Sequence, residues 1–329
     1  MDPDLLARLQ TEGLLSDSAV KKINTLDKRR LFSLHWELRT LLYLGITLLT
    51  GGLGVLVYKN IDTIGHQVIL LVIAGVSAGS LIYCVRTKPP FSRLRVAAPN
   101  SFFDYILLLG CLTFVTFIGY LQYAYTVFGE AYGLATFIPM VVLFFSAYYF
   151  DHLGILSLAI TNLAAWAGIA ITPLRILRDN NLDNNRLIYT GLLLGIGLVV
   201  AGHMTERRNF KKHFEFTYTN FGFHMLFIAG LAGLFLESYL YGLWFLLIVG
   251  MAAFFYRLAT KRSSFYFLLC MTLYTYIALS DVVVRVLWSL ASYDAAPIYL
   301  GLLYFILSAV GLIRLLMFFN KKVKAHDSL

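Results

Sequence analysis

The chain has few charged residues for its length. Asp, Glu, Lys and Arg make up only 14% of its 329 residues, whereas a soluble chain carries about 25%. Hydrophobic residues make up 59% of the sequence. Because so little charge cannot cover the surface of a water-soluble protein of this size, the composition predicts a polytopic membrane protein.

Signals of catalysis and of covalent cross-linking are equally scarce. The three cysteines, Cys84, Cys111 and Cys270, all fall in apolar segments, without the spacing of a disulfide framework or a metal site. The chain contains no His-Glu-x-x-His and no Gly-x-Ser-x-Gly motif. Its first residues have neither the basic nor the apolar region of a cleavable signal peptide. We therefore expect no catalytic residue, no cofactor and no bound metal.

Ten apolar runs approach the roughly 20 residues that a helix needs to span a bilayer. They are continuous rather than alternating, so they predict helices and not the strands of a barrel. The sequence thus predicts an all-α, polytopic integral membrane helix bundle. The runs lie near residues 41–58, 68–85, 104–125, 133–150, 153–172, 187–203, 217–235, 239–256, 265–287 and 298–319.

The basic residues predict the orientation of these spans. With the N-terminus inside, the cytoplasmic segments carry 21 Lys and Arg residues and the outer loops carry four. This asymmetry follows the positive-inside rule and predicts that both termini are cytoplasmic. The basic string over residues 207–212 is then explained by topology and by contact with lipid headgroups. We expect the lipid bilayer as a partner and no nucleic acid, because no basic face on a soluble domain is indicated.

Residues 1–40 are predicted to form a small cytoplasmic helical module, followed by a transmembrane domain over residues 41–329. Asp2 and Pro3 are typical of a helix start, and Gly13 of a helix end. Two or three short helices bury little core, so we expect the module to pack on itself, on the membrane or on a protein partner.

An internal repeat is suggested by two similar segments. Residues 111–118 and 270–277 share four identities in eight positions. The agreement suggests that helices 1–4 and 7–10 are parallel copies related by an axis along the membrane normal. Chance similarity between apolar segments is the alternative.

Glycine motifs occur in three spans. They are Gly51-Gly52-Leu53-Gly54, Gly75-x-x-x-Gly79 and Gly191-x-x-x-Gly195. No strand precedes the first motif and no Lys follows it, so it is not a phosphate-binding loop. Small residues at this spacing allow helices to approach closely, and we expect all three motifs to serve packing.

Polar residues within the spans form a short list of candidate site residues. Asp281 and Arg285 are four residues apart and can pair on one helix face. Gln122 and Asn162 are further candidates for an intramembrane polar site, and Pro139 for a hinge. The Asp281–Arg285 pair would be either a structural clamp in the outer third of the membrane or part of a solute pathway.

A weaker signal comes from two neighbouring residues at the cytoplasmic side. Asp151 and His152 resemble an acid–base couple, but they occupy a short turn between two predicted spans. A structural role is the main expectation for them.

The N-terminal part of the chain resembles a known family. A leucine-rich element ends in Glu12-Gly13-Leu14-Leu15-Ser16-Asp17, a glycine-rich first span follows, and Val57-Tyr-Lys-Asn-Ile-Asp62 comes next. This combination resembles a bacterial family of predicted membrane proteins, domain of unknown function 2157, over about the first 85 residues. Ile61 stands where the resemblance predicts Trp. The resemblance implies a multi-pass protein of the bacterial inner membrane and brings no assigned activity.

Two functions fit these observations. The first is a non-catalytic membrane scaffold or sensor that acts through its N-terminal module, because the spans lack the dense polar cluster of most ion-coupled carriers. The second is a transporter or channel-like protein for a small solute, with a cavity between the two repeats lined by Gln122 and Asp281.

Overall fold

A computed structural model describes residues 34–59, 65–129, 131–171, 185–236, 239–289 and 296–327. Within these ranges the chain is entirely helical, without strands, which confirms the predicted all-α class. Most of the predicted N-terminal module lies outside the described residues. The helices are α3 (Leu34–Lys59), α5 (His66–Thr87), α6 (Ser101–Tyr125), α7 (Tyr132–Phe150), α8 (Leu153–Ile171), α10 (Asn185–Arg207), the 3₁₀ turn η1 (Lys212–Phe214), α11 (Glu215–Leu236), α12 (Tyr241–Lys261), α13 (Phe265–Ser289) and α14 (Ala296–Asp327).

Each of the ten α-helices overlaps one of the ten predicted spans. Eight of them are long and apolar enough to cross a membrane. The apolar parts of the other two, Thr40–Val55 in α3 and Leu153–Gly168 in α8, are shorter within the described residues. The chain is therefore a multi-pass membrane protein in which eight spans are clear by length and composition.

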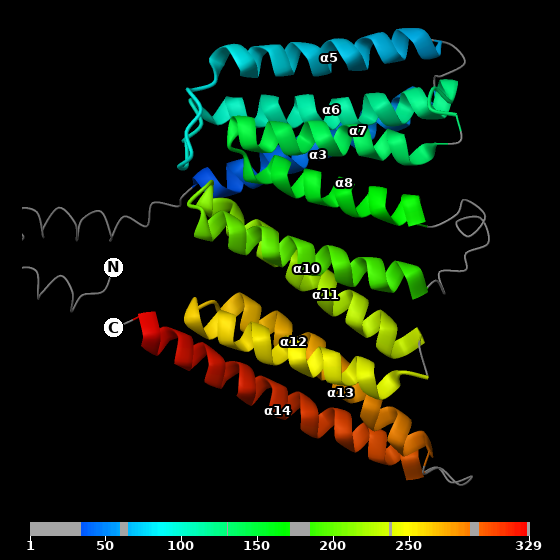
Figure 1. Ribbon diagram of the computed structural model, residues 1–329, viewed down its shortest axis with the longest axis vertical. Helices are drawn as coiled ribbons and strands as arrows, with labels where there is room; N and C mark the ends of the chain where they lie inside the picture. The colour runs from blue at the N-terminus through cyan, green and yellow to red at the C-terminus, as the bar shows by residue number, and fades with distance from the viewer. Residues whose placement is uncertain are drawn as a thin grey trace, which may run out of the picture.

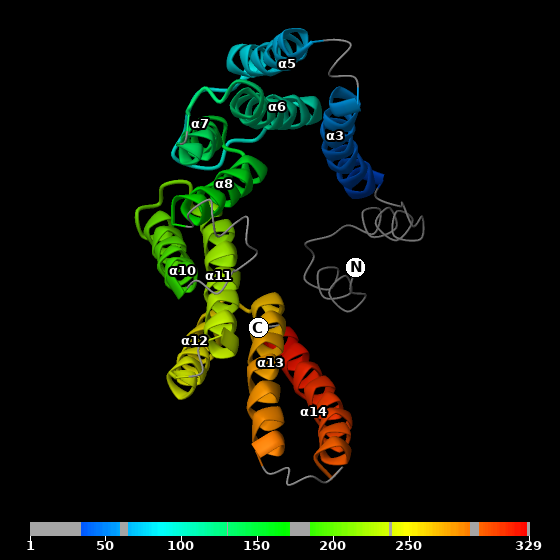
Figure 2. The same cartoon turned by 90° about the vertical axis from the view of Figure 1, so that its right-hand side faces the viewer.

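The helices lie side by side in roughly the order of the sequence, from α5 at one end to α14 at the other (Figure 1). The array curves into an arc, and α3 is set to one side of it, beside α6 (Figure 2). The pairs α5–α6, α7–α8 and α10–α11 have the most extensive packing. The molecule is thus a succession of helical hairpins and has no central barrel or closed ring of helices in its described part.

Two apolar cores hold this succession together. One lies among α5, α6, α7 and α8 and includes Phe103, Leu143 and Ile155, all almost fully buried. The other lies among α11, α12 and α13 and includes Phe223 and Phe255, whose ring centroids are 4.8 Å apart. Their edge-to-face geometry is a favoured aromatic arrangement. Helices α10 and α11 connect the two cores.

The α10–α11 contact depends on glycine. A Cβ atom on Gly195 would lie 2.7 Å from Leu226, and one on Gly222 would lie 2.8 Å from the Gly195 carbonyl oxygen. The packing role predicted for Gly191 and Gly195 is therefore present in the structure. In contrast, a Cβ atom at any glycine of the 51–54 or 75–79 motifs would meet no heavy atom of a neighbouring described segment within 4 Å. The packing expected there is not found among the described residues.

Helix ends place polar groups at one edge of the array. The Asn100 side chain accepts a hydrogen bond from the Phe103 amide at 2.8 Å and caps the N-terminus of α6. Helix α7 ends at Phe150, and the next residue, Asp151, has a φ of +59° in the left-handed region. A left-handed residue is a common helix terminator, and here it turns the Asp151 side chain toward other connections on the same edge.

Candidate functional site

A buried ionic cluster lies at the edge of the array that the basic residues predict to be cytoplasmic. Its centre is Asp151, whose side chain is 2% exposed. One carboxylate oxygen accepts a hydrogen bond from the Val96 amide at 2.5 Å and lies 3.0 Å from Lys211 Nζ. The other oxygen lies 2.6 Å from His213 Nε2. Asp151 therefore joins the 88–100 connection, the α7–α8 turn and the segment after α10.

Lys211 is enclosed as completely as its partner. Its side chain is 1% exposed, its backbone amide donates to the Arg93 carbonyl at 2.8 Å, and its Nζ donates to the Leu94 carbonyl at 3.3 Å. The ammonium also lies 5.1 Å from the centre of the Phe91 ring, within the range of a cation–π contact. A lysine is almost never this buried unless it is paired, so Lys211 is a structural cation and not one that contacts headgroups.

A polar cavity of about 530 Å³ opens beside this cluster. Its wall includes Tyr43 from α3, Arg95 from the 88–100 connection, Asp104 from α6 and His213. The volume lies within the range of small-ligand sites. Both charge signs are present, so the cavity is suited to a polar group and not to an acyl chain.

His152 connects the cavity to the start of α8. Its Nδ1 accepts a hydrogen bond from the Ile155 amide at 3.2 Å, which places the ring proton on Nε2. Nε2 lies 3.8 Å from an Asp104 oxygen. Asp151 and His152 thus use different partners and do not form an acid–base couple with each other, in keeping with the structural role expected for this dipeptide.

A second ionic cluster lies along the same edge. The Arg262 guanidinium donates to Glu206 at 3.0 Å and, by its other terminal nitrogen, to Glu215. Arg262 lies between α12 and α13, and the two glutamates belong to α10 and α11. The ends of four helices are therefore tied by one side chain.

The sequence-predicted pair Asp281–Arg285 is formed. Arg285 Nε donates to an Asp281 carboxylate oxygen at 2.9 Å, and the Tyr241 hydroxyl donates to the same oxygen at 3.0 Å. The guanidinium lies over the Tyr241 ring, 4.6 Å from its centre. Asp281 thus accepts two hydrogen bonds, one from its own helix α13 and one from the first residue of α12.

The other predicted site residues are engaged locally. Gln122 donates to the Gly129 carbonyl at 3.0 Å and accepts from the Phe128 amide at 2.9 Å, which fastens the turn after α6. Asn162 donates to the Leu158 carbonyl of its own helix at 3.0 Å. Pro139 is buried inside α7, which continues as one helix through it.

These residues are not gathered into one site. Gln122 belongs to α6, Asn162 to α8 and the Asp281–Arg285 pair to α13, and these helices are spread along the array (Figure 1). Five cavities formed by the described residues are lined by other side chains. The polar intramembrane site remains a prediction.

Sequence reasoning missed Lys211 and His213 as partners of Asp151. The Asp151–His152 dipeptide and the 207–212 basic string can both be read from the sequence. However, no sequence pattern indicates that these two segments, about 60 residues apart, contact each other. The residues around a lysine near a predicted turn do not distinguish a solvated lysine from a buried one, so the burial of Lys211 could not be predicted.

The fold and the hydropathy of its helices define a multi-pass membrane protein. Residues 7–156 match the model of a family described as "Predicted membrane protein (DUF2157)", so the N-terminal part of the chain is similar to that family. The predicted resemblance is confirmed and extends beyond residue 85, through α7 to the first turn of α8. No curated protein and no solved structure matches the chain.

Proposed function

We propose that the protein is a non-catalytic scaffold or sensor of the inner membrane that acts through its N-terminal helical module, residues 1–40. The observation that carries the proposal is the position of the polar cavity at the predicted cytoplasmic edge, with Tyr43 of α3 in its wall. Because the module leads directly into α3, a partner that binds the module can move Tyr43 relative to the ionic cluster.

The use of polar groups elsewhere supports this proposal. Gln122 and Asn162 bond to backbone atoms of their own segments, and Asp281 is taken by Arg285 and Tyr241. A carrier needs polar side chains that are available to its cargo at membrane depth. In this chain the candidates for that role serve local structure, whereas the polar cavity lies at the edge near the module.

In-cell photo-crosslinking tests this proposal. A photoreactive amino acid at Leu14, in the module, should give one discrete adduct with a partner protein. The same amino acid at Leu182, in the segment between α8 and α10, is the matched control and should give none. Equal labelling at both positions, or none at Leu14 and at further module positions, would contradict a partner-binding role.

The alternative function is a transporter or channel-like protein for a small solute. One observation favours it: α13 packs against α11, α12 and α14 as α6 packs against α3, α5 and α7, which is the arrangement that a parallel repeat predicts. Proteoliposomes carrying the purified chain would then show flux of ions or of small polar solutes, and Asp281→Asn would lower it. The scaffold proposal expects no flux above that of empty vesicles.

A further inference from the structure

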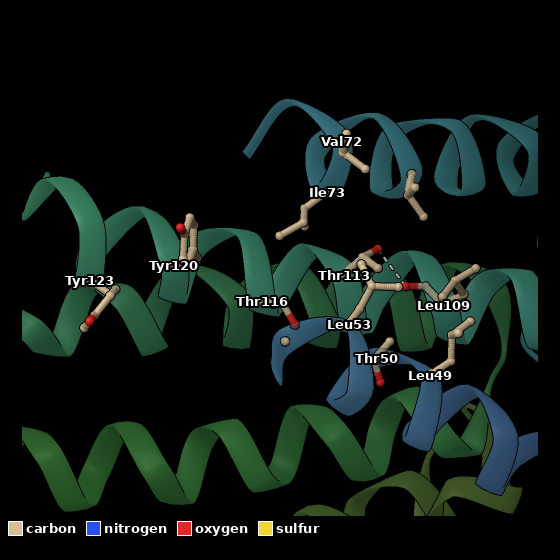
Figure 3. Close-up of a pocket in the computed structure, with 12 residues that line it drawn as sticks. Leu49, Thr50, Leu53, Val72, Ile73, Leu109, Thr113, Thr116, Tyr120 and Tyr123 are labelled. Carbon is tan, nitrogen blue, oxygen red and sulfur yellow. Dashed lines mark hydrogen bonds between the residues drawn. The ribbon is translucent and has the colours of Figure 1, made fainter. Parts of the chain in front are cut away.

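A second cavity lies within the membrane-spanning part, between α3, α5 and α6 (Figure 3). Its volume is about 350 Å³. Helix α6 forms its floor, with Leu49, Leu53 and Gly54 of α3 on one side and Val72 and Ile73 of α5 on the other. The site is separate from the polar cavity at the cytoplasmic edge.

The floor of this groove is a single stripe of α6. It is formed by residues at the spacing of a helix face, which makes the groove long and straight. They are Leu109, Thr113, Thr116, Tyr120 and Tyr123. The first and last are fourteen positions apart, which corresponds to about 21 Å along the helix axis.

The hydroxyl groups in the groove do not make it polar. Thr113 donates to the Leu109 carbonyl at 2.7 Å and Thr116 donates to the Leu112 carbonyl at 2.9 Å. Thr50 of α3 donates to the Ile46 carbonyl of its own helix at 2.9 Å. Each threonine therefore has its hydroxyl satisfied within its own helix, and the lining is suited to a hydrocarbon occupant.

The outer end of the groove is different. His66 Nδ1 and the Tyr120 hydroxyl are 2.8 Å apart, and the Tyr123 ring lies 6.3 Å from the Tyr120 ring. The Tyr125 ring lies 6.4 Å from that of His66. Clusters of tyrosine are typical of the level at which lipid headgroups meet the hydrocarbon, so the groove runs from headgroup level toward the middle of the membrane.

The dimensions decide between a chain and a helix as occupant. Dividing 350 Å³ by about 21 Å gives a mean cross-section of about 17 Å². A polymethylene chain about 4 Å across needs about 13 Å², whereas an α-helix 10 Å across needs about 80 Å². The groove is open along its length, since lining residues such as Leu49 and Tyr123 are exposed, and its lining gains dispersion contacts when a chain of matching width occupies it.

From these observations we propose that the groove between α3, α5 and α6 is a binding site for one acyl chain of a membrane phospholipid of the outer leaflet. The headgroup lies beside His66, Tyr120 and Tyr123, and the chain end lies near Leu49 and Leu109. A Cβ atom at Gly54 would meet no atom of the neighbouring described segments within 4 Å, so the groove has room for an occupant on its α3 side.

Photolabelling of the full-length chain tests the site. The protein is reconstituted into phosphatidylethanolamine and phosphatidylglycerol vesicles containing a trace of phospholipid with a diazirine at the end of one acyl chain. Fragment mass spectrometry should find adducts concentrated on the lining residues of α3, α5 and α6. Helix α14, whose apolar residues are largely exposed, reports unspecific contact with bulk lipid and should carry few adducts.

Filling variants make the test specific. Gly54→Phe should lose the concentrated labelling, down to the level of α14. Gly52→Phe is the matched control and should keep it, because Gly52 lies in the same helix, also has open space around it, and does not line the groove. Thr116→Phe fills the groove from the α6 side, where the side chain is exposed, and should lose the labelling too if Gly54→Phe does not fold.

Four outcomes would overturn the proposal. The first is labelling of α3, α5 and α6 that is no greater than that of α14. The second is labelling that survives both filling variants. The third is concentrated labelling by a diazirine fatty acid that excess phospholipid does not displace, which would assign the groove to a free acid. A cysteine at Thr50 that cross-links to its counterpart in a second copy would assign the groove to a protein interface instead.

Discussion

Replacing Lys211 with Met should loosen the edge of the array that carries the buried ionic cluster. The substitution removes the ammonium that lies 3.0 Å from Asp151 while leaving that carboxylate 2% exposed. Breaking a buried ion pair from one side costs about 3–5 kcal/mol, because the remaining charge is left uncompensated. His213 remains as a partner at 2.6 Å, which places the expected cost at the lower end, about 3 kcal/mol.

The assay follows the geometry of the cluster. Asp151 accepts from the Val96 amide, so the 88–100 connection should open first. The side chains of Arg93 and Arg95 are already exposed, but trypsin also needs the backbone on either side of them to be released from the fold. If cleavage follows the population of the open form, a cost of about 3 kcal/mol predicts roughly a hundredfold faster cleavage at these two arginines. Lys212→Met is the matched control, since this neighbouring lysine is exposed, and should leave the rate within about twofold.

Two results would refute the reasoning. Equal cleavage rates in the Lys211→Met and Lys212→Met variants would mean that the buried pair does not hold the connection. Likewise, pairing Lys211→Met with Asp151→Asn should restore much of the loss, because removing both charges of a buried pair is often close to neutral and Asn tolerates the left-handed φ of this position. A double variant less stable than either single one would show that the cluster acts through something other than charge pairing.

Three further predictions concern the rest of the array. Gly222→Ala should destabilise the α10–α11 contact by about 1–3 kcal/mol through overpacking, measured as a lower midpoint of unfolding in mixed micelles, whereas Gly197→Ala, with nothing within 4 Å, should not. A double-mutant cycle on Asp281 and Arg285 should give a coupling of only about 0.2–1 kcal/mol, because Arg285 is 43% exposed; a coupling several times larger would indicate a buried role. Gln122→Ala should speed hydrogen exchange in the turn after α6, since two hydrogen bonds of about 1 kcal/mol each are lost, and unchanged exchange would contradict the fastening role.

The helices of this protein were predictable because their signal is local. An apolar run near 20 residues long has few structural choices in a bilayer, and each predicted run overlaps an observed helix. The i,i+4 pairing of Asp281 and Arg285 was predictable for the same reason, since helix geometry alone places the two on one face. The partner Tyr241, forty residues away, was not indicated by any local pattern.

The cluster around Asp151 shows where local reasoning ends. Its partners lie 55 to 62 residues away in sequence, and they meet because α8 and α10 return the chain to the same edge. The glycine motifs show the same limit. Gly195 and Gly51 have similar apolar surroundings in the sequence, but only Gly195 has a helix packed against it. Which glycine lies in a helix–helix contact depends on how the helices are arranged in the fold, and the local sequence does not contain that information.

The hairpin order of the array also has a consequence for biosynthesis. Since α5 packs on α6, α7 on α8 and α10 on α11, most contacts can form as soon as each pair leaves the ribosome, and such low contact order favours fast assembly. The bond between Asp151 and Lys211 is an exception, because Lys211 is synthesised only after α10. Until then Asp151 can bond to the Val96 amide, which is already synthesised, but not to Lys211. Its pairing with Lys211 then fixes the first half of the chain to the second.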